Sequence, residues 1–211
     1  DFDVALHGLL LGSLKAHKRV VFNGNGYSDE WVAEAARRGL PNIKSMVEAS
    51  SALTTEKSIA LFEKFGIFNR VELASREEIL YETYSKTINI EALTMIQMAR
   101  KQILPAVMKY TKTLADTVIA VKEAGADASV QAETLKNISA KLTEANKALE
   151  TLEEKTAKAA DFRNQKEKAF YFRNEVFFAM EDLRTPVDAL ETMVDKAAWP
   201  IPTYGELIFE V

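Results

Sequence analysis

Residues 75–125 read SREEILYETYSKTINIEALTMIQMARKQILPAVMKYTKTLADTVIAVKEAG, and this stretch decides the fold. It begins with a helix-start signal, because Ser75 and Glu78 can each cap the free backbone N–H of the other. It ends at Gly125, a residue suited to the left-handed position that follows a helix. Such a helix would be about 70 Å long. We therefore expect the rest of the chain to pack along it or against a partner.

Pro105 divides this predicted helix into a buried half and a more exposed half. Before Pro105, apolar residues lie on several faces of the helix, which indicates burial. After it, the apolar residues narrow to a seam, namely Val107, Tyr110, Leu114, Val118 and Val121. Proline removes one backbone hydrogen bond, so we expect a kink there. Residues 85–90 contain few strong helix formers, which predicts a local irregularity.

A second long helix is expected to start near Asp127 or Ser129, directly after Gly125. Its apolar residues follow heptad spacing without a skip: Leu135, Ile138, Leu142, Ala145, Leu149 and Leu152. The link between the two helices is short, so they should run antiparallel. The sequence thus predicts an antiparallel coiled-coil arm with its tip near Gly125. Residues 156–161 contain no large apolar residue, so we expect a turn there or a stutter in the heptad pattern.

An aromatic-rich helix follows from Lys168. Its large apolar side chains are Phe170, Tyr171, Phe172, Val176, Phe177, Phe178, Met180 and Leu183. If these rings lay on a solvated surface, they would form an interaction patch. We therefore favour a packed core over an aromatic ligand-binding site. We expect this helix to pack on the buried half of the first long helix. Pro186 should start or kink a further helical piece.

The first part of the chain predicts shorter elements. Residues 1–18 have the apolar spacing of a helix, residues 19–22 form a β-like run, and residues 23–26 (NGNG) form a tight turn. Ser28 should cap a helix that ends at Gly39. Asp29 and Glu30 in its first turn would repel a phosphate, so the glycine-rich turn is read as structural rather than as an anion site. A further short helix should run from Thr55 to Gly66, a glycine that stops it.

The C-terminal residues predict a strand. Residues 199–205 (WPIPTYG) cannot be helical, and in residues 206–211 the apolar Leu207, Phe209 and Val211 alternate with other residues. A single strand leaves backbone groups unpaired. It could pair with residues 19–22 or with a sheet outside this chain, and we favour the second. The apolar pattern also begins at the first residue, so we expect this to be the C-terminal part of a larger protein.

The composition contains little material for catalysis. The 211 residues carry a net charge of −4, contain no cysteine, and have only two histidines, His7 and His17, whose spacing does not place them side by side on a helix. A chain without excess positive charge is a poor partner for nucleic acid, and no apolar run reaches the length of a membrane span. We therefore predict no catalytic, cofactor-binding or metal-ligating residue, no nucleic-acid or membrane partner, and a cytoplasmic location.

The expected fold class is mainly α: a helical bundle with a long antiparallel coiled-coil arm and a short C-terminal β-strand. Three parts are predicted. Residues 1–74 form a part with short helices that continues from a domain outside the chain. Residues 75–198 form the long-helix bundle with the arm, and residues 199–211 form a tail and strand.

Several stretches together resemble the C-terminal region of type III glutamine synthetase, the long-chain bacterial form. Two are long: residues 85–107 (SKTINIEALTMIQMARKQILPAV) and residues 199–211 (WPIPTYGELIFEV). The others are residues 19–28 (RVVFNGNGYS), 172–176 (FRNEV) and 183–186 (LRTP). The resemblance covers essentially the whole chain, in order and at suitable spacing.

This resemblance implies a part of an enzyme of glutamine biosynthesis, and hence of nitrogen metabolism, that joins glutamate and ammonia with ATP through a γ-glutamyl phosphate. It implies Mg²⁺ or Mn²⁺ and ATP in the full-length enzyme, all bound by a catalytic domain that precedes this region, and none in this chain. It also implies a double-ringed dodecamer. The partners would then be the catalytic domain of the same protein and neighbouring subunits, and the isolated chain would be inactive.

Two other functions remain as alternatives. The chain could be a stand-alone helical adaptor or interaction protein that binds partner helices through its coiled-coil arm. An independent small enzyme ranks third, because no nucleophile–base pair or metal cluster is visible in the sequence.

Overall fold

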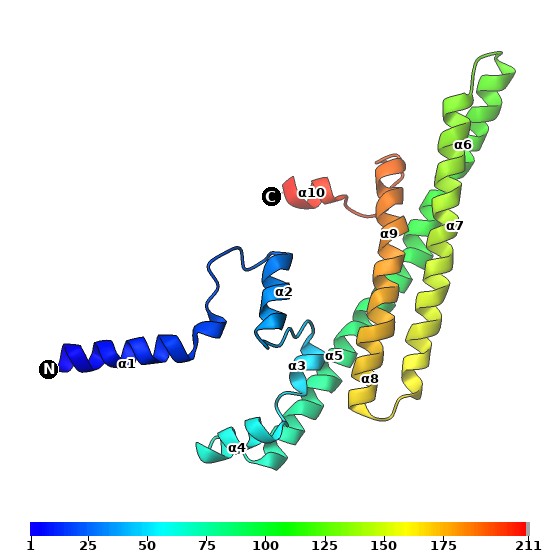
Figure 1. Cartoon of the computed structure of the whole chain (residues 1–211). Helices are drawn as coiled ribbons and strands as arrows, with labels where there is room; N and C mark the ends of the chain where they lie inside the picture. Colours follow the sequence, from blue (N-terminus) through cyan, green and yellow to red (C-terminus); the bar gives the residue numbers. More distant parts are fainter. Residues whose placement is uncertain (210–211) are drawn as a thin grey trace. The chain divides into compact units, whose positions relative to one another are not determined.

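The computed structural model describes residues 1–209, which are mainly helical and contain no strand (Figure 1). The helices are α1 (Phe2–Ala16), α2 (Asp29–Arg37), α3 (Met46–Ser50), α4 (Glu56–Lys64), α5 (Arg70–Met98), α6 (Leu104–Glu123), α7 (Ser129–Lys158), α8 (Gln165–Tyr171), α9 (Phe177–Met193) and α10 (Tyr204–Phe209). Two π-helical segments, η2 (Ala99–Ile103) and η4 (Phe172–Val176), interrupt the long helices. The chain divides into two compact units, residues 1–49 and residues 50–211.

In the first unit, the expected helix over residues 1–18 is confirmed as α1. The β-like run at residues 19–22 is wrong, because residues Lys18–Val20 form a 3-10 turn, η1, that continues from the end of α1. The Val20 N–H donates to the His17 carbonyl, and the Val21 N–H donates to the Lys18 carbonyl. These local bonds use the donors that a strand would offer to a neighbour. Ser28 caps α2 as predicted, by accepting from the Trp31 N–H at 3.3 Å.

Helix α5 begins at Arg70, five residues before the predicted start at Ser75. Its true cap is a reciprocal pair: the Asn69 side chain accepts from the Glu72 N–H at 3.0 Å, and the Glu72 carboxylate accepts from the Asn69 N–H at 2.8 Å. This capping box leaves the Ser75 signal inside the helix. The helix that starts after Thr55 and stops at Gly66 is confirmed as α4.

The predicted irregularity at residues 85–90 is wrong, because α5 passes through them unbroken. The Ser85 hydroxyl, which is buried, donates to the Tyr81 carbonyl at 2.9 Å and so lies within the helix without competing with it. The disturbance expected at Pro105 instead takes the form of η2, whose wider turns come just before the proline. Pro105 lacks an N–H and cannot donate to the Lys101 carbonyl, and the Leu104 N–H donates to the Ala99 carbonyl, five residues back, as in a π-helix.

Helices α6 and α7 lie side by side and antiparallel, with a short connection at one end (Figure 1). Gly125 adopts φ +78° in this connection, as predicted. Its N–H donates to the Lys122 carbonyl and the Ala126 N–H donates to the Val121 carbonyl, which is the Schellman pattern of a helix end. The predicted start near Ser129 is also confirmed.

The core of the second unit gathers on α7. Ile138, Ala145, Leu149 and Leu152 are completely buried, and all four belong to the predicted heptad seam. Helix α7 packs along α6 and also along α9. Helix α7 ends at Lys158 and a 3-10 turn, η3 (Ala159–Asp161), follows it, which confirms the turn expected at residues 156–161.

The aromatic-rich segment packs on α5 as predicted. Phe172 is 1% exposed and belongs to the same cluster as Val176, Leu183 and Leu190, so this part of the segment is packed core. Helix α9 runs through Pro186 from Phe177 to Met193, so the proline does not start a new helix.

The predicted C-terminal strand is wrong for residues 206–209, and the prediction that residues 199–205 are not helical is wrong for Tyr204 and Gly205, because α10 runs from Tyr204 to Phe209. A capping box starts a helix here, although the apolar residues alternate as in a strand. The Glu206 carboxylate accepts from the Thr203 N–H at 2.8 Å, and the Thr203 hydroxyl accepts from the Glu206 N–H at 3.3 Å. Lys196 pairs with the same carboxylate at 2.8 Å. Val211 and Glu210, the last residues of the expected strand, lie outside the described residues.

Gly125→Ala should destabilise the second unit by about 1 kcal/mol or more, because alanine is strained at a positive φ. A Cβ at Gly125 meets no atom within 4 Å, so the backbone strain alone sets the cost. Gly125→Asn should cost less, because asparagine tolerates this conformation. Urea unfolding monitored by circular dichroism measures both free energies. Equal costs for alanine and asparagine would contradict this account of the connection.

Ile138→Ala should cost about 2–5 kcal/mol of unfolding free energy, because Ile138 is fully buried and the truncation leaves a cavity. Ile119 lies in the neighbouring α6 and is 55% exposed, so the matched change Ile119→Ala should cost about 0.5 kcal/mol or less. The two variants delete the same atoms, and their difference in urea unfolding measures packing in the α6–α7 pair. A cost below about 1 kcal/mol for Ile138→Ala would overturn the assignment of the seam.

Candidate functional site

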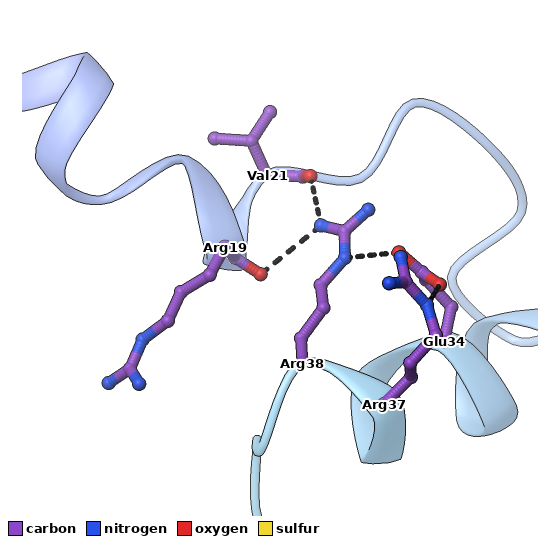
Figure 2. Close-up of polar contacts among 5 residues, drawn as sticks. All are labelled: Arg19, Val21, Glu34, Arg37 and Arg38. Carbon is purple, nitrogen blue, oxygen red and sulfur yellow. Dashed lines mark hydrogen bonds and ion pairs between the residues drawn. The ribbon is translucent and has the colours of Figure 1, made fainter.

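In the first unit, Arg38 holds the loop that follows α1 (Figure 2). Its Nη1 donates to the carbonyl of Arg19 at 3.1 Å and to that of Val21 at 2.6 Å. Its Nε donates to Glu34 at 2.5 Å, and Arg37 donates two hydrogen bonds to the same carboxylate. A guanidinium offers donors in a fixed planar fork, so one residue can join the loop carbonyls to α2.

Aromatic stacking completes this clamp. The Phe22 ring stacks on the Trp31 ring with centroids 4.5 Å apart, and the Arg38 guanidinium lies 6.0 and 5.6 Å from the two centroids. Gly24 lies against Phe22 so closely that a Cβ there would be 2.7 Å from the ring. The NGNG turn therefore uses glycine to let the backbone approach the ring.

The charged side chains of this cluster bind groups of the same unit. Hydrogen bonds from Arg37, and then from Arg38, lower the pKa of Glu34 to about 2. Both guanidiniums are thus engaged with Glu34, and Arg38 also with the loop carbonyls. These hydrogen bonds can fix the shape of the loop between α1 and α2. Tyr27 in this loop is fully exposed.

Helix α1 is exposed and apolar on more than one face. Phe2 and Leu9, seven residues apart, lie on one face and are 76% and 71% exposed. Val4 and Leu11 lie on the opposite face, and no residue of α1 is buried. A helix that is apolar all round is normally surrounded by protein. Burying each such side chain is worth about 1.5–3 kcal/mol, so α1 exposes a large amount of apolar surface in this chain.

The second unit contains an apolar pocket of about 230 Å³. Its walls come from the end of α5 with η2, from α9, and from the segment that leads into α10. The main apolar side chains are Met95, Met98, Ile103, Leu183, Val187 and Trp199. Three of the stretches that carry the family resemblance, residues 85–107, 183–186 and 199–211, meet at this pocket.

The charged side chains that line this pocket come from α9. Arg184, Asp188 and Glu191 of α9 contribute charged side chains to its lining, and Arg184 donates to Asp188 at 3.1 Å. Trp199 is 7% exposed, and its indole Nε1 is buried without an acceptor among the described residues. A buried donor without a partner costs about 1–3 kcal/mol, so the attachment of the C-terminal segment at Trp199 is not optimised for stability.

A second, polar pocket of about 280 Å³ lies between α5, the end of α7 and α8. It is lined by Glu82, Lys86 and Lys168, among others, and Lys86 forms an ion pair with Glu82 at 2.6 Å. The hydroxyl of Thr156, which also contributes to the lining, is buried without a partner. The ion pair with Glu82 neutralises Lys86, and Lys168 contributes a second positive charge to the lining.

No site residue was predicted from the sequence, so there is no predicted cluster for the structure to assemble. His7 lies within α1 and His17 directly after it, both exposed. Among residues 1–209, no three His, Cys, Asp or Glu side chains are grouped as metal ligands. No helix in this part of the chain has the length and apolarity to cross a membrane. The sequence does not predict the apolar pocket, because its walls lie up to about a hundred residues apart. The one sequence feature that links these walls is that each belongs to a stretch resembling type III glutamine synthetase.

The chain matches the model of the glutamine synthetase C-terminal domain over residues 5–122. It is 40% identical to a glutamine synthetase of Butyrivibrio fibrisolvens over 96% of this chain and 29% of that protein. A type-3 glutamine synthetase of Dictyostelium discoideum is 34% identical over 98% of the chain, and a glutamine synthetase of Bacteroides fragilis is 33% identical over 98%.

These features define a helical module with an exposed apolar helix and two pockets. The chain belongs to the glutamine synthetase C-terminal domain family, which confirms the resemblance to type III glutamine synthetase. It spans about 29% of the length of the curated relatives that it matches.

Lowering the pH should release the loop from Arg38. The pKa of Glu34 is depressed in the folded unit, so its stabilising effect is complete above its unfolded pKa of about 4.5 and is lost as the pH falls toward 2. In a Trp199→Phe variant, Trp31 is the remaining tryptophan and its fluorescence reports on the stack with Phe22. We expect a fluorescence transition between about pH 4.5 and pH 2.

The matched control adds Glu34→Gln, which removes the titrating group. This variant should show the released-loop fluorescence already at pH 7, and should lack the acid transition. Identical titrations with and without Glu34→Gln would show that this carboxylate does not hold the loop.

Proposed function

We propose that this chain is the structural C-terminal region of a type III glutamine synthetase and serves assembly or regulation of that enzyme. The ligation of glutamate and ammonia, with ATP and Mg²⁺ or Mn²⁺, belongs to a catalytic domain elsewhere in the same protein. The chain itself contributes no catalytic residue and is inactive in isolation. The complete enzyme works in the cytoplasm.

The observation that carries this proposal is α1, which has exposed apolar side chains on opposite faces. Such a helix needs protein around it, and relatives of this family extend far beyond the matched part. The catalytic domain of the same protein is therefore the partner that we propose for α1. The clamp at Arg38 supports this, because it fixes the loop after α1 in one shape (Figure 2).

The α6–α7 pair supports a role in assembly. Its buried residues follow heptad spacing, and we propose that the pair is an antiparallel coiled-coil arm. Toward its tip, Ile119 and Val130 are 55% and 72% exposed. Exposed apolar residues at the end of a protruding arm are suited to contact with a neighbouring subunit. A homo-oligomer, in the form of a dodecamer, is the assembly that we propose.

The alternative is a stand-alone adaptor that binds other helices through the same arm. The two functions differ in what α1 does. In an adaptor, α1 has no catalytic domain to contact, so changes in α1 would leave partner binding by the arm intact. In the enzyme, changes in α1 affect assembly and ligation together.

In the complete enzyme, Leu9→Asp and Leu11→Asp should each lower glutamine formation about tenfold or more and shift the oligomer toward smaller species. The two residues lie on opposite faces of α1 and are exposed in this chain, and each substitution puts a charge where the proposed contact with the catalytic domain would bury an apolar side chain. Mass photometry measures the assembly, and release of phosphate from ATP with glutamate and ammonia measures the reaction. The isolated 211-residue chain should show no ligation.

His7→Asp is the matched control, since it adds the same charge to α1 at a polar position, and it should leave assembly and rate within about twofold. Wild-type assembly and activity in both leucine variants would contradict the proposal. Ligation by the isolated chain would contradict it as well.

A further inference from the structure

The polar pocket between α5, the end of α7 and α8 contains a positive charge that its own lining does not neutralise. Lys168 of α8 lines the pocket, is half-buried, and forms no ion pair or hydrogen bond with any of residues 1–209. Glu82 and Lys86, which also line it, neutralise each other through their ion pair at 2.6 Å. The ionised side chains of the lining therefore leave one positive charge, which favours an anion.

The hydroxyl of Thr156 is a second group of this pocket without a partner. The other threonines of α7 donate to the carbonyls four residues before them, at 2.8, 3.0 and 3.1 Å: Thr134, Thr143 and Thr151. Thr156 is 7% exposed and lines the pocket, and its hydroxyl has no hydrogen-bond partner among the described residues. A buried hydroxyl without a partner lowers stability, and a ligand oxygen in the pocket would remove that cost.

Two amide side chains add further hydrogen-bonding capacity. Asn89 of α5 and Gln165 of α8 line the pocket, and neither side chain forms a hydrogen bond within the part of the chain that the structure describes. An amide can donate to an anion and can also accept from a hydroxyl group. The volume of about 280 Å³ corresponds to about nine water molecules at ~30 Å³ each, so the ligand that fits is small and polar.

The helix ends beside the pocket do not decide the sign of the ligand. The carboxyl end of α7 carries a partial negative charge and the amino end of α8 a partial positive charge, and residues of both ends line the pocket. These partial charges oppose each other. The charge of Lys168 therefore determines that the ligand is an anion.

We propose that this pocket binds a small polar anion, with a phosphate or carboxylate group on a hydroxylated body. The Lys168 ammonium group and the Thr156 hydroxyl bind the anionic group. The amides of Asn89 and Gln165 bind the hydroxyl groups of the body. The site lies within the second unit and does not rest on the assembly function proposed above.

The test is isothermal titration calorimetry of the 211-residue chain with glycerol 3-phosphate, after circular dichroism has shown that the chain is helical. Glycerate presents a carboxylate on a similar body, and glycerol carries no charge. We expect saturable binding of glycerol 3-phosphate with a Kd of about 1 mM or below, weaker binding of glycerate because its charge is smaller, and no binding of glycerol. If the isolated chain is not helical, the complete enzyme is titrated with and without Lys168→Gln, and the difference gives the same constant.

The two anions distinguish the source of the charge. Tighter binding of glycerol 3-phosphate identifies a phosphate as the anionic group, and tighter binding of glycerate identifies a carboxylate. Binding of glycerol as tight as that of the anions would overturn the proposal, and so would the absence of saturable binding of both anions.

A pair of charge variants locates the anion. Lys168→Gln should weaken binding of glycerol 3-phosphate at least about fivefold. Lys166→Gln is the matched control, because it removes the same charge two residues away from a lysine that pairs with Glu77 at 3.6 Å and does not line this pocket. It should leave the Kd within about twofold. Equal effects of the two variants would show that net charge rather than this pocket attracts the anion, and would contradict the proposal.

The role of the Thr156 hydroxyl has its own test. Thr156→Val keeps the shape of the side chain, and should weaken binding about two- to fivefold while shifting the urea midpoint of the free chain upward, because it removes the unpaired hydroxyl. Thr156→Ser keeps the hydroxyl and should bind within about twofold of the unchanged chain. A purely structural threonine would instead lower the midpoint when replaced by valine, and that result would overturn its assignment to the ligand.

Filling the pocket separates this site from binding elsewhere on the chain. Ala160 is exposed and lines the pocket, so Ala160→Phe adds volume there without disturbing a buried position. This variant should weaken binding of glycerol 3-phosphate at least about tenfold. Unchanged binding to the folded, filled variant would place the anion elsewhere and contradict the proposal.

Discussion

The second unit depends on the buried seam of α7. Four side chains of this helix, Ile138, Ala145, Leu149 and Leu152, have no exposed surface, although only three of them are large. The helix packs along α6 on one side and α9 on the other. A single stripe that serves two neighbours must be continuous, and heptad spacing is what keeps a stripe continuous along a helix. The small Ala145 in the middle permits close approach of the neighbouring helices.

The two π-helical segments show how long helices adjust to this packing. Segment η2 precedes Pro105, and η4 follows α8 within the aromatic-rich segment. Each adds a wide turn that shifts the apolar side chains after it around the helix axis. Both contribute buried side chains, Ile103 from η2 and Phe172 with Val176 from η4. A strictly regular helix would carry these side chains in a different direction relative to the seam of α7.

The sequence predicted what local chemistry and periodicity determine. Gly125 ends its helix at a positive φ, and four of the six predicted heptad residues of α7 are buried. The helix end and the apolar period are both local features of the sequence, and the period marks the face that packs on α6 and α9. At two places the structure uses a local signal other than the one that predicts the element. Asn69 and Glu72 cap α5 ahead of Ser75, and Thr203 and Glu206 cap α10 where the alternation around Leu207 predicts a strand.

Pro105 marks the place of η2 but not its form, whereas η4 and the apolar pocket have no local signal. A wide turn is set by the packing of the whole helix, and the sequence around Ala99 shows only ordinary helix formers. The pocket joins α5, α9 and the segment after Trp199, whose approach depends on the fold of the entire unit. The apolar alternation predicts a strand at residues 206–209, whereas Leu207 lies in α10 and lines the pocket.

The two units are stabilised in different ways, and this difference bears on function. In the second unit, large apolar side chains such as Phe172 are buried within the unit itself. In the first unit, the apolar residues of α1 remain exposed, and order comes from the hydrogen bonds of Arg38 and the stack of Phe22 on Trp31. Hydrogen bonds and a stacked pair define a shape but remove little apolar surface from water. A segment that is shaped in this way and left apolar outside is suited to complete its burial against another part of its protein.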